Sequence, residues 1–193
     1  MKQNLRIAFL MTVVTAVLFG LVYPLAVTGL GQLLFPSQAN GGLIVKNGQI
    51  IGSHLIGQTF SSDSYFHSRP SAAGNGYDPV SAGGGASNLG PTNRQLLDRV
   101  KGDVEKLHAE NPGSPIPIDL VTTSGSGLDP DISPAAAEFQ IPRVARARRV
   151  SETQLHSLIA KHTSGRQLGV LGEPRINVLE LNLDLDAQFP ISK

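Results

Sequence analysis

The chain has 193 residues, and its 16 Lys and Arg nearly balance its 15 Asp and Glu, so the formal net charge at pH 7 is +1. A charge this close to zero does not indicate nucleic acid or an anionic membrane surface as a bulk partner. Because the sequence contains no Cys, it excludes a disulfide framework, a thiolate zinc site and a thiol nucleophile.

Residues 7–29 form an uncharged apolar run in which Thr, Tyr and Pro are the main interruptions. As an α-helix this run extends about 34 Å, which is enough to cross a hydrocarbon core of roughly 30 Å. A cleaved secretory signal peptide is the alternative, but its apolar core spans only about 7–15 residues. We therefore expect a membrane span that stays attached to the protein.

The basic residues around this run predict its orientation. Lys2 and Arg6 precede it, and the next basic residue is Lys46. The positive-inside rule therefore places the short N-terminal segment in the cytoplasm. The expected organisation is a cytoplasmic N-terminus at 1–6, a transmembrane helix with an interfacial extension at 7–34, a linker at 35–42 and one extracytoplasmic domain at 43–193.

Small residues recur every four positions within the span, at Ala8, Thr12, Ala16 and Gly20. On a helix they lie along one stripe, where a second helix can approach closely. The alternative is that Ala and Gly are simply common in membrane helices. Pro24 lacks an N–H and its ring crowds the carbonyl of Gly20, so we expect a kink or a weakened turn between these two residues.

The next elements alternate between a hairpin, a long loop and a helix. Residues 43–51 predict a β-hairpin, because Asn47-Gly48 suits the positive φ angles of a primed turn. Residues 57–91 are polar and rich in glycine, and their interspersed aromatics favour an ordered functional loop over disorder. An amphipathic pattern predicts a helix at 93–108, which Thr92 can cap.

The C-terminal half predicts short strands and helices. Residues 116–121 suggest a strand bounded by prolines, and Ser133-Pro134 begins a helix at 135–140. Pro142 predicts a break before a second short helix at 144–150. Ser151 and Gln154 form a capping-box pattern for a third helix, and alternating leucines at 179–185 predict a half-buried strand. The fold class is thus α+β (mixed), with a small sheet and several short helices.

Two glycine-rich segments, 81–90 and 124–127, superficially resemble phosphate-binding loops. Neither has the Lys and hydroxyl order of a P-loop, so turns and close backbone packing are the favoured explanation. Asp119, Asp129 and Asp131 could ligate a hard cation, although Asp-Pro-Asp is more often a turn with a capping acid. We therefore predict no metal site.

The histidines and arginines give no catalytic pattern. The five His have no H-E-x-x-H spacing, and no G-x-S-x-G elbow supports a hydrolase. Arg143, Arg146, Arg148 and Arg149 form a basic cluster, for which a solvated face is the favoured interpretation and an acidic partner or lipid headgroups the alternative. No catalytic residue is predicted.

Several long segments, found in order along nearly the whole chain, resemble the KdpC family, which provides one of the subunits of the potassium-transporting P-type ATPase. These segments are residues 57–60, 65–72, 87–93, 124–130, 132–135, 143–145, 147–148 and 171–182. The resemblance implies a single-pass protein of the bacterial inner membrane, with its C-terminal domain in the periplasm. Its partners would be a channel-like potassium-binding subunit, a P-type ATP-hydrolysing subunit, a small single-span subunit and membrane lipid, with no nucleic acid.

The resemblance also implies the role and the residues that serve it. The protein would be a non-catalytic assembly and regulatory component, a catalytic chaperone that raises the affinity of the pump subunit for ATP, in a complex that transports potassium. Residues in the shared motifs would contact a partner or ligand: Tyr65, Phe66, Arg69, Pro70, Ser87, Asn88, Leu89, Ser124, Ser126, Gly127, Asp129, Pro130, Gln140, Arg143, Gly172, Glu173 and Asn177. No cofactor is expected to bind this chain directly.

The predicted topology limits how ATP and potassium could be involved. The sequence lacks the D-K-T-G motif of a P-type pump, so this chain is not the motor. An extracytoplasmic domain is separated from cytosolic ATP by the bilayer, so an effect on ATP affinity would be indirect coupling. The acidic turn at Asp129 and Asp131 suggests instead a role in potassium entry. A membrane-tethered nucleotide-binding or hydrolytic module acting alone is the alternative from another class.

Overall fold

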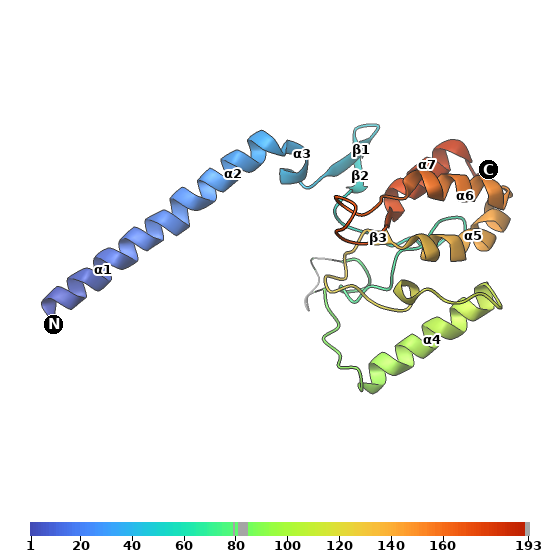
Figure 1. Cartoon of the computed structure of the whole chain (residues 1–193), viewed down its shortest axis with the longest axis horizontal. Helices are drawn as coiled ribbons and strands as arrows, with labels where there is room; N and C mark the ends of the chain where they lie inside the picture. The colour runs from blue at the N-terminus through green and yellow to red at the C-terminus, as the bar shows by residue number, and fades with distance from the viewer. Residues whose placement is uncertain (79, 81–84, 192–193) are drawn as a thin grey trace. The chain divides into compact units, whose positions relative to one another are not determined.

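The computed structural model describes residues 1–78, 80 and 85–191. The chain divides into two units, Met1–Ile51 and Gly52–Lys193. The described part combines helices with two small two-stranded sheets (Figure 1), which confirms the mixed α+β class.

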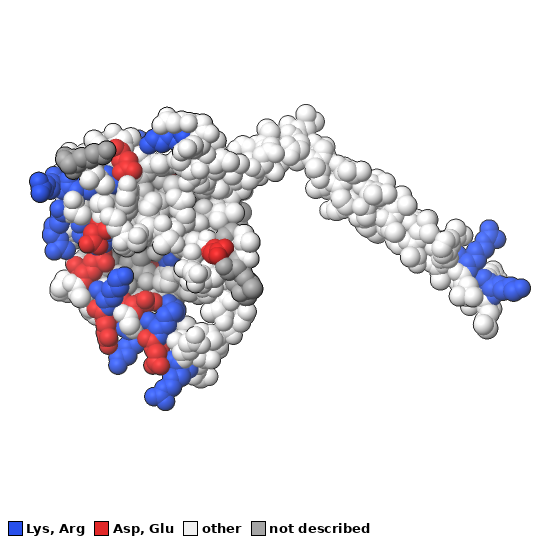
Figure 2. Space-filling model, turned by 180° about the vertical axis from the view of Figure 1, so that it is seen from behind, with Lys and Arg blue, Asp and Glu red and all other residues white. Residues whose placement is uncertain are grey.

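The first unit is dominated by a long apolar helix over Lys2–Leu34, whose 33 residues suit a membrane span by length and composition. It consists of α1 (Lys2–Val17), a π-helical turn (Leu18–Val22) and α2 (Tyr23–Leu34). Its apolar side chains are exposed. On the face shown in Figure 2 the helix is uncharged except at one end, in keeping with Lys2 and Arg6 in the sequence.

The π-helical turn lies where the sequence predicts a disturbance. Pro24 has no N–H to donate and its ring crowds the carbonyl of Gly20, so a regular α-helix is strained at this point. The backbone widens locally, and the N–H of Tyr23 bonds to the carbonyl of Leu18. Wide turns of this kind relieve such clashes without ending the helix.

A short helix and a hairpin follow the long helix. Helix α3 covers Pro36–Ala39, and β1 (Leu43–Lys46) pairs with β2 (Gln49–Ser53). Asn47 and Gly48 have φ angles of 52° and 78°, the left-handed values that a primed turn requires. The predicted hairpin is confirmed.

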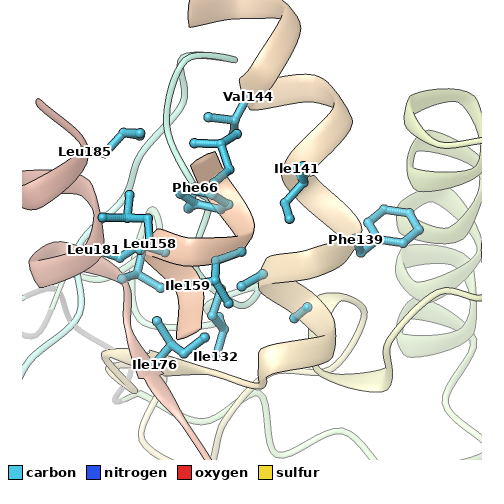
Figure 3. Packing of buried hydrophobic residues seen from close by; sticks show 14 of the residues in the cluster. Phe66, Ile132, Phe139, Ile141, Val144, Leu158, Ile159, Ile176, Leu181 and Leu185 are labelled. Atoms are coloured by element: carbon cyan, nitrogen blue, oxygen red, sulfur yellow. The ribbon is translucent and has the colours of Figure 1, made fainter. Parts of the chain in front are cut away.

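The core of the second unit lies among three helices. These are α5 (Pro134–Arg148), α6 (Glu152–His162) and α7 (Val178–Gln188), and β3 (Asp131–Ile132) pairs antiparallel with β4 (Ile176–Asn177) beside them. Figure 3 shows Ile141 and Val144 of α5, Leu158 of α6 and Leu181 of α7 converging around Phe66. Phe66 comes from the long loop, which is therefore part of the core.

Helix α4 (Arg94–Glu110) packs on this core through one edge only. Asn93 caps it by accepting a hydrogen bond from the N–H of Gln95, one residue later than the predicted cap at Thr92. All its residues are at least partly exposed, and Leu107 is the one that packs against the core cluster. The amphipathic helix predicted from the sequence is confirmed.

Two predicted strands are wrong. Within 116–121 the chain forms a single 3₁₀ turn, Ile118–Leu120, because the prolines at 115 and 117 remove N–H donors from any ladder. Residues 179–185 lie in α7, where Val178, Leu181 and Leu185 are buried at helical spacing. Asn177 caps this helix by accepting from the N–H of Glu180, a start signal that outweighs the alternation of leucines.

The predicted break at Pro142 is also wrong, since α5 runs without interruption through this residue. A proline inside a helix costs about 3 kcal/mol. Ile141 and Val144 on either side are almost fully buried, and their burial offsets that cost. The predicted N-caps of α5 and α6 are confirmed: Ser133 accepts from the N–H of Ala136, and Ser151 forms a full capping box with Gln154.

Candidate functional site

Two buried amides hold the long loop against the helices. The side chain of Asn182 accepts from the N–H of Phe66 and donates to its carbonyl, both at 2.9 Å. Gln140 does the same for His67, accepting from its N–H at 2.7 Å and donating to its carbonyl at 3.1 Å. Each amide is 2% exposed, so side chains of α5 and α7 replace the partner strand that this extended segment lacks.

Two arginines of α5 hold the same loop in place. Arg143 donates to the carbonyls of Asp63 and Tyr65 and pairs with Glu110 of α4. Arg148, whose side chain is fully buried, donates to the carbonyls of Ser64 and Phe189 and pairs with Asp186 at 2.7 Å. We call Gln140, Arg143, Arg148 and Asn182 the polar frame.

The solvated face predicted for the arginine cluster is wrong for two of its four members. Arg143 and Arg148 are buried because loop carbonyls and carboxylates satisfy their N–H groups, while Arg146 and Arg149 are exposed. The Arg148 guanidinium also lies 4.7 Å from the centre of the Tyr65 ring. Burial and the neighbouring Asp186 raise the pKa of Tyr65, and burial together with Arg143 lowers the pKa of His67.

A second joint fastens the loop to the segment before β3. Arg69 pairs with Asp129 at 2.9 Å, and Ser71 donates to the carbonyl of Gly127 at 2.6 Å. The Tyr77 hydroxyl lies 3.1 Å from the carbonyl oxygen of Arg69 and 3.2 Å from that of Asp129. Burial raises the pKa of Tyr77 to about 12. The described part of the loop is therefore fixed to the helices and to the segment before β3.

The two glycine-rich segments lie against each other. A Cβ on Gly127 would collide with the carbonyl oxygen of Gly85, and one on Gly85 would collide with that of Ser126. These glycines permit close backbone contact, which supports the packing interpretation over a phosphate-binding loop. Residues 81–84 of the first segment lie outside the described residues.

The three acidic residues considered for a cation each have a partner. Asp119 accepts from the N–H and hydroxyl of Ser133, Asp129 pairs with Arg69, and Asp131 pairs with Arg175 at 3.1 Å. Burial raises the pKa of Asp131, and the negative charge of Asp129 adds to this effect. The three aspartates line a groove of about 490 Å³, which Arg69 and Arg175 also line. Over 1–78, 80 and 85–191, no three His, Asp or Glu side chains are placed to hold a metal ion.

The remaining motif residues serve turns and caps or line grooves. Ser124 and Ser126 accept from backbone N–H groups of their own turn, Pro130 accepts from the N–H of Val178, and Asn177 donates to the carbonyl of His54. Glu173 pairs with Arg166, and Gly172 has a φ of 76°. Pro70 lines a groove under α4, while Ser87 and Leu89 line a second groove at this helix, with Asn88 between them at a φ of 51°. Most of the motif residues therefore belong to one structural scaffold, whereas Gly172 and Glu173 lie in the exposed segment before β4.

The predicted contact residues leave out three residues of this scaffold, Arg148, Tyr77 and Asn182, although segments 147–148 and 171–182 contain two of them. Asn182 sits in a run of leucines, and a polar residue on the buried face of a helix is the signal that could have revealed it. The strand interpretation placed Asn182 on the solvent side instead. Arg148 belonged to the basic cluster, and nothing local distinguished it from Arg149.

The stripe of small residues lies on the exposed surface of the long helix. Ala8, Thr12, Ala16 and Gly20 are all exposed, and a Cβ on Gly20 would meet no atom within 4 Å. The Thr12 hydroxyl turns back to the carbonyl of Ala8 at 2.9 Å, so it presents its methyl group to the surroundings.

Comparisons with known proteins give one consistent result. The family described as "KdpC: K+-transporting ATPase, c chain" matches residues 5–187. A potassium-transporting ATPase KdpC subunit of Koribacter versatilis is 63% identical over 191 residues, covering 99% of this chain and 98% of the relative. Proteins of the same name from Acidobacterium capsulatum and Methylobacterium nodulans are 59% and 54% identical, and each pairing covers at least 95% of both chains.

Proposed function

The chain belongs to the KdpC family of K+-transporting ATPase c chains, and from that premise we propose that it is a membrane-anchored, non-catalytic assembly and regulatory subunit of the complex. The observation that carries this proposal is the 33-residue apolar helix, whose large apolar side chains are exposed. A helix of this kind requires lipid or other membrane helices around it. The stripe Ala8, Thr12, Ala16 and Gly20 is the face that would meet a partner helix.

The proposed partners are the channel-like potassium-binding subunit, the ATP-hydrolysing pump subunit and the small single-span subunit. Lys2 and Arg6, the only charged residues among the first 42, favour a cytoplasmic N-terminus in a bacterial inner membrane. The second unit then lies in the periplasm. In that position, any increase in the affinity of the pump for ATP acts through the complex, by favouring one pump state, and not by contact with the nucleotide.

Four of the five histidines are paired with groups of the described chain. His54, His156 and His162 pair with Glu180, Glu138 and Asp184, and the His67 ring bonds to the carbonyl of Ser62. The acidic groove gives little support to direct potassium binding, because Arg69 and Arg175 neutralise Asp129 and Asp131.

The experiment is to purify the complex with a Gly20→Leu chain and with a Val14→Leu chain. Val14 lies on the helix face opposite the stripe, so its variant controls for a leucine placed away from the stripe. We expect Gly20→Leu to reduce the amount of this chain that co-purifies with the other subunits, and to slow growth at limiting potassium, while Val14→Leu does neither. Normal co-purification of Gly20→Leu would contradict the proposed packing face.

Topology is tested separately with a reporter fused after Lys193. We expect activity from a periplasmic reporter and none from one that works only in the cytosol. The opposite pattern would remove the argument for indirect coupling to ATP, although family membership would stand.

A further inference from the structure

A small hairpin projects from the connection between α6 and β4 (Figure 1). Ser164 and Arg175 exchange backbone hydrogen bonds in both directions, at 2.9 and 3.0 Å, and nearer the tip Gln167 and Leu171 do the same at 2.8 and 2.9 Å. Arg166 and Glu173 also form an ion pair across its arms. These cross-links give residues 164–175, here called the tip hairpin, a defined shape.

The end of the tip hairpin is apolar and open to solvent. Leu168, Val170 and Leu171 are 90%, 72% and 56% exposed. Single exposed apolar side chains are ordinary on a protein surface, but three within four residues, on a segment that folds back on itself, form a patch.

The turn at the end of the tip hairpin is built at a conformational cost. Leu168 and Gly169 have φ angles of 52° and 75°, the same left-handed pair that Asn47 and Gly48 adopt in the β1–β2 hairpin. Asn tolerates this conformation and a bulky apolar residue does so poorly. The chain thus places Leu where the backbone prefers Asn, which indicates that position 168 needs the apolar side chain.

The charge and composition of the tip hairpin favour a protein pocket over a lipid surface as its binding partner. Arg166 is neutralised by Glu173, and Arg175 by Asp131. Residues 163–175 contain no aromatic residue. Segments that insert into a membrane interface carry unpaired basic residues and Trp or Phe, so this neutral aliphatic tip is unlike them. Aliphatic side chains on a rigid turn suit a preformed apolar pocket instead.

We propose that Leu168, Val170 and Leu171 insert into an apolar pocket on another subunit of the same K+-transporting ATPase, as a contact separate from that of the membrane helix. This inference rests on the proposed function, because it requires a complex in which the chain is a subunit. It assigns the second unit a specific docking element of about four residues, 168–171.

The first test is photo-crosslinking in the assembled complex, with a photoreactive amino acid at position 168 and, as control, at position 118. Ile118 is 75% exposed and lies outside the tip hairpin, so it reports on non-specific contact. We expect a crosslink from position 168 to one other subunit, at least about tenfold stronger than from position 118. A crosslink to lipid, a crosslink to a second copy of this chain, or no excess over position 118 would overturn the proposal.

The second test is the double variant Leu168→Asn, Val170→Thr, compared with Ile118→Thr. Asn relieves the backbone at position 168, so the thermal midpoint of the full chain in detergent should be unchanged or higher. We expect at least about a threefold loss of the chain from the complex during washing, against no loss for Ile118→Thr. Equal retention would overturn the docking role. If the unsubstituted chain itself fails to co-purify, the proposed function fails instead.

Discussion

Replacing Asn182 with Leu tests whether the polar frame holds the long loop. Leu has a similar volume and suits a helix, so the change removes the amide and leaves the packing nearly intact. The N–H and the carbonyl of Phe66 then lose their partners at 2.9 Å, inside a site where Asn182 is 2% exposed. A buried polar group without a partner costs about 1–3 kcal/mol, so two of them cost about 2–6 kcal/mol. A loss of that size is a large part of the ~5–15 kcal/mol by which domains are stable.

The measurement is urea unfolding of the full chain in detergent, followed by the fluorescence of tyrosine, since Tyr65 and Tyr77 both lie in the loop. Gln95→Leu is the matched control: it makes the same amide-to-leucine change at an exposed position of α4, where about ±0.5 kcal/mol is expected. A loss below about 1 kcal/mol for Asn182→Leu would refute the reasoning, because it would mean that Phe66 finds other partners.

Two further predictions concern titration. Since burial raises the pKa of Tyr77 from 10.0 to about 12, its neutral phenol stabilises the fold fully below pH 10 and this contribution is lost as the pH rises toward 12. An ultraviolet titration of the full chain should show one phenol ionising near pH 12, and Tyr77→Phe should abolish that step; persistence of the step would assign it elsewhere. Hydrogen bonds from Lys161, Gln188 and His162 lower the pKa of Asp184 below 3.8, so its contribution is present above that pH and lost in acid. Asp184→Asn should therefore lower the urea midpoint at neutral pH and have less effect in acid, and an equal loss at both would contradict this account.

The parts of the fold that the sequence predicts correctly depend on neighbours within a few residues. Asn47-Gly48 specifies its turn, Ser133-Pro134 and Ser151 specify their caps, and Pro24 specifies the disturbed helix. In each case the determining contact lies within four or five positions. Physical rules for turns and caps apply directly at that range.

Most of the failures have a different cause, which is long-range packing. The exception is the strand predicted at 116–121, which the neighbouring prolines exclude. The leucines at 179–185 fit a strand by alternation, yet the helix is chosen because one of its faces meets Phe66 and α6. Gln140 and Asn182 contact loop residues 73 and 116 positions away. Patterns over a few residues cannot predict contacts between positions so far apart in the sequence. Similarity to a family could therefore mark Gln140 and Arg143 as important but could not give their role.

The motif residues therefore divide by the direction in which they act. Those of the polar frame point inward and hold the loop, so substitutions there act through the stability of the second unit. The side chains of Leu168, Val170 and Leu171 at the end of the tip hairpin are exposed, so substitutions there should act on assembly alone. A variant of Arg143 that fails to assemble would thus say nothing about a contact, because the same failure follows from unfolding. Only a variant that keeps its unfolding midpoint and still leaves the complex identifies a surface that a partner touches.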